Sequence, residues 1–499
     1  MGGAGLVLLV AALLIYTAGD LWQNIAWPPF FSFDETLEVD YVYQLTQGHL
    51  PTFFGGAEFN PLHMDYPYDV QWRYQHPPLF YALEAPVFLL FDTLHHPIRG
   101  IWAMRALVWV MGVLLIVCSR WAAKWVIGGE CPAVSLVPVI VASNRCLPSV
   151  VFNYTLASLW VTLLIGMTAK LVRSMLEDDV LTGSLTTYAS TVRMIVLWWL
   201  IVALAPLTRL STVPIMGLCL LIVFLAVLLS SHRRIRNITV LCVLPGIIAV
   251  AASAWFYLRL HALSGNFTGS QPEWSRTHLQ RNTNKTFIQA LLDPHFYKST
   301  MSQYQNSAVT NTGWGWAFVL LLTVIPMVVG FMGIIMWAVR RYRGDGGMPA
   351  ANAFLGGRGA GRAALLMALM LALSFGGTVF QQLLFYKQGG SDNAVYFSLI
   401  SIVFAVVIAM GFTWDGLPGW MSNGVVCMWL TLKVTALLYE AALKWPFAVG
   451  GTMEHAGLPA QFAAYSSLVV TCAGVLIAAV TVCLRPRPRL GAPNRPTAG

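Results

Sequence analysis

A short segment near the N-terminus places several carboxylates on one predicted helix. The sequence Ser32-Phe33-Asp34-Glu35 matches a capping box, in which the serine caps the helix start and the glutamate three positions later returns the bond. The helix is predicted to continue to Gln47, and Asp34, Glu38 and Tyr41 share one of its faces. A carboxylate held on such a face can act as a general base that takes a proton from a hydroxyl group.

These acids also have ordinary structural interpretations. Glu35 can serve only as the cap partner, while Asp34 and Glu38 can simply favour the positive start of a helix and a solvated face. Asp34 differs because it lies in the first turn, among aromatic residues that hold this turn near a membrane. Partial desolvation makes a carboxylate a stronger base, so Asp34 is a candidate general base.

Later in the same loop comes His76-Pro77-Pro78-Leu79. Proline restricts His76 to extended geometry and can open the helix predicted from Leu79 to Leu94, which carries Glu84. This apolar helix is predicted to lie on the outer leaflet or to dip into it, because the next span must run inward. His76 is therefore either an interfacial N-cap or a residue that faces a ligand.

Arg209 falls inside a predicted membrane span, and Arg259 falls near the end of another. A charge inside a span costs free energy and is usually paired or functional. Because guanidinium groups bind phosphate oxygens in bidentate fashion, Arg209 is a candidate anion-binding residue. A basic residue at a helix end is common, so Arg259 is the weaker candidate on pattern alone.

The elements that must position these residues are membrane helices. Hydrophobic residues make up 57% of the chain and charged residues 10%, and the mean hydropathy is +0.66. A span needs about 20 apolar residues, and the sequence contains about twelve such runs. We predict an all-α polytopic membrane protein with these spans: Gly5 to Leu21, Ile101 to Ser119, Ala133 to Leu147, Val151 to Thr168, Met194 to Leu207, Val213 to Ser230, Val240 to Ala254, Ala317 to Val339, Ala363 to Phe385, Val395 to Phe412, Val425 to Ala442 and Ser466 to Cys483.

Basic residues set the orientation of this bundle, because lysine and arginine are retained on the cytoplasmic side. With the N-terminus inside, most of them fall in cytoplasmic loops, so the net charge of +9 reflects topology and no basic soluble domain suggests a nucleic-acid partner. The transmembrane domain covers residues 1–484, with outer loops at about 22–100 and 255–316 and a basic cytoplasmic tail at 485–499. The eight cysteines lie in or beside spans, which indicates no disulfide framework.

The motifs of the first outer loop resemble those of GT-C glycosyltransferases. The likeness rests on Phe33-Asp34-Glu35, Gly48-His49-Leu50-Pro51 and His76-Pro77-Pro78-Leu79-Phe80-Tyr81. It is greatest to the bacterial relatives of protein O-mannosyltransferases and of the lipid A aminoarabinose transferase, which use polyprenyl-phosphate sugars outside the cytoplasmic membrane. Three later stretches resemble further motifs of the same enzymes: Leu207 to Ser211, Trp255 to Asn266 and Gln388 to Ser401.

The resemblance implies a role for each matched residue. Asp34 becomes the catalytic carboxylate and Glu35 its motif partner. Substrate-binding roles fall to the remaining matched positions, with His76 near the lipid phosphate, and these positions are Glu38, His76, Arg209, Tyr257 and Arg259.

Two positions depart from the family pattern. The family often has a histidine where this chain has Glu38, and many members have an acid where this chain has Asn153 and Tyr154. Without that second acid, a divalent cation such as Mg²⁺ or Mn²⁺ remains only a candidate cofactor. Glu35, Glu38 and the nearby His49 or His63 do not have the spacing that is diagnostic of a metal site.

The resemblance implies transfer of a mannose- or arabinose-type sugar from polyprenyl phosphate to a hydroxyl group on a glycan, lipid or protein. It also implies a bacterial cytoplasmic membrane with the site on its outer face. Two other classes fit the same composition. A lipid transporter or flippase would use Arg209, Lys433 and the acids to line a path, and a non-catalytic assembly subunit would keep the fold without the second acid.

Overall fold

The structure is a computed structural model that describes residues 3–26, 29–30, 33–61, 69–147, 150–177, 185–230, 234–281, 284–343, 358–414, 417–450 and 458–484. Within these ranges the chain is helical and contains no strand, and nine helices are long and apolar enough to cross a membrane. These are α1 (Gly3–Ala26), α4 (Pro97–Ile127), α6 (Tyr154–Leu176), α8 (Thr212–Leu229), α9 with α10 (Arg234–Ser264), α15 with α16 (Gly315–Arg343), α17 (Arg358–Lys387), α20 (Gly419–Gly450) and α21 (Leu458–Cys483). The predicted all-α polytopic membrane protein is confirmed.

Three further apolar helices account for the remaining predicted spans. They are α5 (Pro132–Ala142), α7 (Leu185–Leu204) and α19 (Ser401–Phe412). Each of the twelve predicted runs therefore falls on a helix, although these three are the shorter or less completely described ones. Hydropathy locates helices well because every backbone polar group within a membrane must be bonded inside its own helix.

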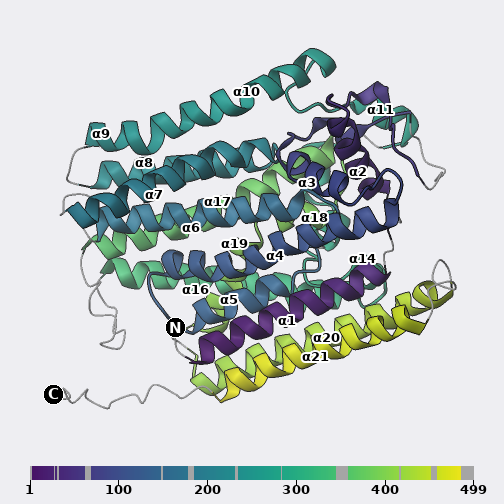
Figure 1. Ribbon diagram of the computed structural model, residues 1–499. Helices are drawn as coiled ribbons and strands as arrows, with labels where there is room; N and C mark the ends of the chain where they lie inside the picture. The colour runs from purple at the N-terminus through teal and green to yellow at the C-terminus, as the bar shows by residue number, and fades with distance from the viewer. Residues whose placement is uncertain are drawn as a thin grey trace.

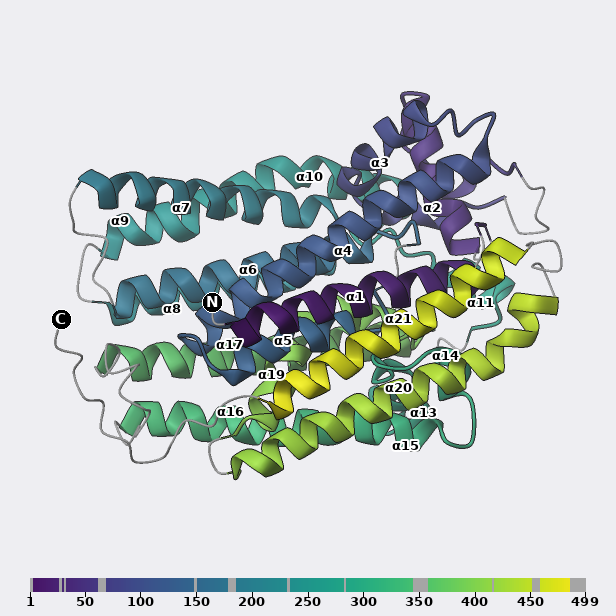
Figure 2. The same cartoon turned by 60° about the horizontal axis from the view of Figure 1, so that its bottom comes forward.

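The long helices run side by side and divide the molecule into two ends (Figure 1). One end carries the start of α1, the finish of α21 and the basic helix α9 (Arg234–Ile238). The other carries α2 (Phe33–Thr46), α3 (Leu79–Leu90) and α11 (Pro272–His278), as the second view also shows (Figure 2). The described start of α1 and the described end of α21 therefore lie at the same end of the bundle.

Close helix packing holds the middle of the bundle. Helix α1 packs on α21 and α5, α4 packs on α6, and α16 packs on both α17 and α19. Gly330 of α16 lies against the backbone of α19, where an added Cβ would collide with Val407. Small residues at such contacts let membrane helices approach closely and gain dispersion energy.

Helices α5 and α19 lie in the centre and reach only part of the way across. They contact each other, and every residue of α5 from Ala133 to Ala142 is buried. At 1.5 Å per residue each is about 16 to 18 Å long, little more than half of a 30 Å hydrocarbon core. The chain is irregular after Ala142, and only the four-residue helix α18 (Val395–Ser398) precedes Ser401, so loops and this short helix continue the centre of the bundle beyond α5 and α19. Irregular backbone at membrane depth is tolerated where it is enclosed by protein or lines a cavity.

The first outer loop has the two helices that its sequence predicts. Helix α2 begins at Phe33 and ends at Thr46, and Gly48 follows with φ +90°, the left-handed geometry of a glycine C-cap. Ser32, the predicted cap, lies outside the described residues. Helix α3 begins at Leu79, as predicted, and ends at Leu90, four residues earlier than predicted.

Aromatic side chains join the two outer loops into one cap. Tyr74 is buried and donates a hydrogen bond to the carbonyl of Gly269 at 2.5 Å, and its ring packs edge-on against Phe53. Trp72 packs against Trp274 of α11 in the same cluster. The cap is therefore rigid enough to hold side chains from both loops over the end of the bundle.

Candidate active site

Asp34 forms an ion pair with Arg73, which is the centre of the site. Asp34 lies in the first turn of α2, and Arg73 lies in the short helix η2 (Trp72–Gln75). The Asp34 side chain is 35% exposed and the Arg73 side chain 10%. The two nearby carboxylates of α2, Glu35 and Glu38, are fully buried. Asp34 is therefore the one acid of this first stretch of α2 that an acceptor hydroxyl can reach.

Arg73 also lies beside Glu38, which faces the same spot one turn along α2. The Nε atom of Arg73 lies 3.5 Å from Oε1 of Glu38, and the Tyr81 hydroxyl donates to Oε2 at 2.7 Å. Burial raises the pKa of Glu38 to about 7, against the opposing effects of Arg73 and Tyr81. The negative charges of Asp34 and Glu38 raise the pKa of Arg73, so this guanidinium stays charged.

The raised pKa of Glu38 predicts a pH dependence. Below pH 7 the carboxyl is protonated and Arg73 pairs with Asp34 alone. Above pH 7 the ionised Glu38 competes for the guanidinium and leaves Asp34 freer to accept a proton. The turnover rate of the wild type is expected to rise through pH 7, and a pH profile of Glu38→Gln is expected to lose that step. An unchanged profile in Glu38→Gln would contradict this assignment.

A chain of neutral groups links Glu38 to Arg209. The Asn153 amide lies 3.4 Å from the Tyr81 hydroxyl and accepts a hydrogen bond from Arg209 at 2.6 Å. Arg209 also donates to the Tyr154 hydroxyl at 2.5 Å, and its guanidinium lies 3.7 Å from the centre of the Tyr154 ring. The positions where relatives have a second acid therefore carry two neutral ligands of Arg209.

Arg209 is buried and carries an unpaired charge. Its side chain is 8% exposed, and within the described ranges it forms no ion pair. A buried cation bonded only to neutral groups stabilises any anion that enters beside it. The sequence-based choice of Arg209 as an anion-binding residue therefore has a geometric basis.

His76 lies at the edge of the same cluster. Its Nε2 atom lies 3.5 Å from Nη1 of Arg73, and its carbonyl accepts a hydrogen bond from Tyr41 at 3.0 Å. Burial and the neighbouring arginines hold the pKa of His76 well below its usual value. The imidazole is neutral at pH 7, so it can exchange a hydrogen bond with a ligand but adds no charge for a phosphate.

The Glu35 carboxylate does not lie beside that of Asp34 but against helix α4. Its carboxylate receives two hydrogen bonds from Arg105 of α4, at 2.8 and 2.6 Å. The backbone N–H groups of Val151 and Phe30 donate to it at 3.0 and 3.3 Å. Glu35 is thus a buried structural anchor that ties α2 to α4 and to the segment before α6, and its oxygens are all engaged.

Tyr257 and Arg259 lie on α10 and hold the surrounding loops. The Tyr257 hydroxyl donates to the carbonyl of Pro206 at 2.8 Å. Arg259 donates to the carbonyls of Leu50 and Pro51 at 3.1 and 2.9 Å, while its Nη1 atom is buried without a partner in the described structure. Tyr257 thus contacts the backbone just after α7, Arg259 contacts the backbone of the cap, and one buried nitrogen of Arg259 has no described partner.

Two acids of this region have roles that sequence reasoning missed. Asp40 accepts hydrogen bonds from the N–H groups of Glu58 and Phe59 at 2.7 and 2.8 Å and from Gln71 at 2.5 Å, which fixes the loop between α2 and η2. Glu84 of α3 is buried with neither oxygen bonded in the described structure, and burial raises its pKa well above the usual value. Glu84 therefore has no described partner that stabilises its charged form.

The acids of α2 do not form a metal site with their described neighbours. Asp34 and Glu38 share Arg73, Glu35 is bonded to Arg105, and His49 lies 3.4 Å from Glu58 on the exposed side. No group of three acid, histidine or cysteine side chains with suitable geometry occurs among the described residues, and His63 lies outside them. The positive charge that pairs with Asp34 among the described residues is the guanidinium of Arg73.

Phe152 lies near the Asp34–Arg73 ion pair and also lines a pocket of about 440 Å³. Its ring lies 5.9 Å from the Arg73 guanidinium and 6.5 Å from the Tyr154 ring. The pocket is lined by the segment after α5, by the second outer loop and by residues 391–395. It therefore lies beyond the end of α5 and before the start of α19.

Comparison with known proteins finds similarity to solved structures in the fold alone. No family model matches the sequence, and no curated protein matches it. Among solved structures the chain is similar to ArnT from Cupriavidus metallidurans bound to undecaprenyl phosphate, with 13% identity, a TM-score of 0.47 and coverage of 95% of this chain and 76% of that one. It is also similar to the oligosaccharyltransferase AglB from Archaeoglobus fulgidus in complex with an inhibitory peptide and a dolichol-phosphate, with 16% identity and a TM-score of 0.44. That likeness covers 96% of this chain and 56% of AglB, so the chain spans just over half of its length.

Proposed function

We propose that the protein is a membrane glycosyltransferase that moves a mannose- or arabinose-type sugar from a polyprenyl-phosphate donor to a hydroxyl acceptor at the outer face of the membrane. The observation that carries the proposal is the buried Arg209, which has no counter-ion in the described structure and lies in one cluster with the Asp34–Arg73 pair. A lipid-linked phosphate supplies the missing anion, and the exposed carboxylate supplies the base.

The reaction is a displacement at the anomeric carbon of the sugar. Asp34 accepts the proton of the acceptor hydroxyl while the acceptor oxygen bonds to that carbon. The bond between the carbon and the phosphate oxygen breaks, and polyprenyl phosphate leaves with the electron pair. Arg209 and Arg73 stabilise the charge that develops on the leaving phosphate, because both are held in place before the reaction by contacts on the protein.

Replacing Arg209 tests the phosphate site. Arg209→Met is expected to raise the KM for a polyprenyl-phosphate sugar by about 10- to 100-fold, because a buried charge-assisted contact to the phosphate is lost. Arg209→Lys is expected to recover part of this loss, since lysine keeps the charge but not the planar fork. The matched control is Arg276→Met, at an exposed position on α11. An unchanged donor KM in Arg209→Met would overturn the assignment.

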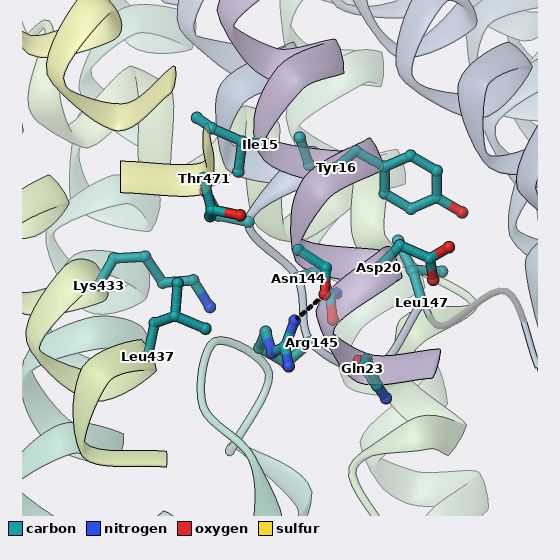
Figure 3. Close-up of a pocket in the computed structure, with 13 residues that line it drawn as sticks. Ile15, Tyr16, Asp20, Gln23, Asn144, Arg145, Leu147, Lys433, Leu437 and Thr471 are labelled. Atoms are coloured by element: carbon teal, nitrogen blue, oxygen red, sulfur yellow. Dashed lines mark hydrogen bonds between the residues drawn. The ribbon is translucent and has the colours of Figure 1, made fainter. Parts of the chain in front are cut away.

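A transporter or flippase is the second candidate, because charged residues lie inside the bundle. Arg145 donates to Glu440 at 2.8 Å, and the Lys433 amine donates to the carbonyl of Tyr304 at 2.5 Å. Figure 3 shows Lys433 and Arg145 beside one small cavity. The cavity has about 20 Å³, which is room for a single water molecule, and its charges are bonded to protein groups. This geometry favours a structural role for these residues over a substrate path.

A further inference from the structure

We propose that the polar pocket of about 440 Å³ binds the acceptor, and that the acceptor end it receives is an uncharged, polyhydroxylated glycan. This inference rests on the proposed glycosyl transfer and adds the chemical class of the second substrate. The alternatives, a cationic amino sugar and an anionic sugar, are outcomes of the test.

The position of the pocket separates it from the phosphate site. The segment from Val150 to Tyr154 passes between the two. Val150 and Phe152 line the pocket, while Asn153 and Tyr154 hold Arg209. A donor phosphate at Arg209 and an acceptor in the pocket would therefore approach Asp34 and Arg73 from different sides. Displacement at a sugar carbon needs this arrangement, with nucleophile and leaving group apart.

Most of the residues that line the pocket have polar side chains, and the lining is almost free of net charge. Its hydrogen-bonding groups are mostly serine, threonine, asparagine and glutamine side chains, such as Ser299, Asn306 and Ser391. The charged side chains that line it are each neutralised nearby. Arg145 pairs with Glu440 at 2.8 Å, and His295 lies 2.7 Å from Asp392. These charged side chains are paired with protein groups, whereas hydroxyl groups of a ligand can both donate to and accept from the amides and hydroxyls of the lining.

Two buried polar atoms in the lining have no partner in the described structure. Gln305 is 2% exposed, and its Oε1 atom accepts no hydrogen bond. Arg145 carries an unpartnered buried Nε as well, although its terminal nitrogens bond to Glu440 and to the carbonyl of Gly19. Both atoms are enclosed beside the cavity and are not open to it, so the polar groups that a ligand can reach are the serine, threonine and asparagine side chains of the lining. The Phe152 ring adds an apolar surface against which a sugar ring can pack.

The test blocks the pocket and measures binding and transfer separately. Ser391→Trp fills the pocket from a position whose hydroxyl forms no hydrogen bond in the described structure, and Ser275→Trp on α11 is the matched control outside it. Purified full-length protein is titrated by calorimetry with four probes without donor: hexyl mannoside, hexyl arabinofuranoside, hexyl glucuronide and hexyl glucosaminide. With a polyprenyl-phosphate sugar, transfer to these probes and release of polyprenyl phosphate to water are followed in parallel.

Blocking the pocket is expected to weaken binding of the acceptor and to leave the donor kinetics unchanged. A neutral glycoside is expected to bind the wild type at least about tenfold more tightly than the charged ones, and Ser391→Trp is expected to weaken that binding by about tenfold or more. Ser391→Trp should leave donor KM and hydrolytic release within about twofold of the wild type, as should Ser275→Trp. Equal binding by Ser391→Trp and the wild type, tighter binding of a charged probe, or a rise in donor KM in Ser391→Trp would each overturn the inference. If the wild type binds a neutral glycoside but cleaves no donor, the proposed function fails while the pocket assignment stands.

Discussion

Asp34→Asn is expected to lower the turnover rate of sugar transfer about a thousandfold, within the range that loss of a general base produces. Asparagine keeps the size of the side chain but cannot accept the proton of the acceptor hydroxyl. Donor KM should change little, because Arg209 and its ligands Asn153 and Tyr154 are not altered. Steady-state assays with a polyprenyl-phosphate sugar and a hydroxyl acceptor measure both quantities.

Comparing Asp34→Asn with Asp40→Asn distinguishes loss of the general base from a disturbance of the helix that carries it. Asp40→Asn, on the same helix, alters a carboxylate that is bonded to backbone N–H groups of the cap and does not face Arg73. Asp40→Asn should lower the free energy of unfolding. The turnover rate of the variant that remains folded should fall much less. Turnover of Asp34→Asn at the wild-type rate would remove Asp34 from the reaction.

Glu35→Ala is expected to destabilise the protein by about 3 to 5 kcal/mol, because it leaves the Arg105 charge buried without its carboxylate. The variant also removes the acceptor for the N–H groups of Val151 and Phe30. Thermal unfolding in detergent should therefore show a clear drop in Tm, together with loss of activity. We expect this loss of activity to follow from the lower stability of the fold, since the Glu35 oxygens are bonded to other groups of the protein.

The double variant Glu35→Leu with Arg105→Met tests that explanation. Replacing both partners of a buried pair with apolar residues is often close to neutral in stability, so Tm should recover most of the loss. Glu58→Ala, whose side chain is 43% exposed, is the control and should change Tm little. A full loss of activity in a Glu35→Gln variant that keeps the wild-type Tm would instead restore the catalytic role that the family resemblance implies.

The helices of this protein could be predicted because their signals are local. Apolar runs identify the spans, and the residues around Gly48 and Leu79 mark where the helices of the first outer loop end and begin. The lengths of α5 and α19 were overestimated at one end, since an apolar run shows where a helix is possible and not where loops enter the bundle.

The partners of the site residues could not be predicted, because they come from distant parts of the chain. Asp34 and Glu35 are adjacent in sequence, yet they face Arg73 and Arg105 respectively. Arg105 did carry a signal, since it lies within a predicted span where a charge needs a partner. Arg73 had a weaker one, as a basic residue three positions before His76. Neither signal says which acid is paired, because that depends on how α2 rests on α4 and η2.

The central claim is that this site cleaves a lipid-linked sugar phosphate with Asp34 as the base. The most direct measurement places the purified protein in liposomes with a polyprenyl-phosphate mannose or arabinose donor and a hydroxyl acceptor, and follows free polyprenyl phosphate and glycosylated acceptor by mass spectrometry. We expect the two products to appear together in the wild type and to be almost absent with Asp34→Asn. A donor that crosses the bilayer intact, or that is cleaved as fast by Asp34→Asn as by the wild type, would contradict the claim.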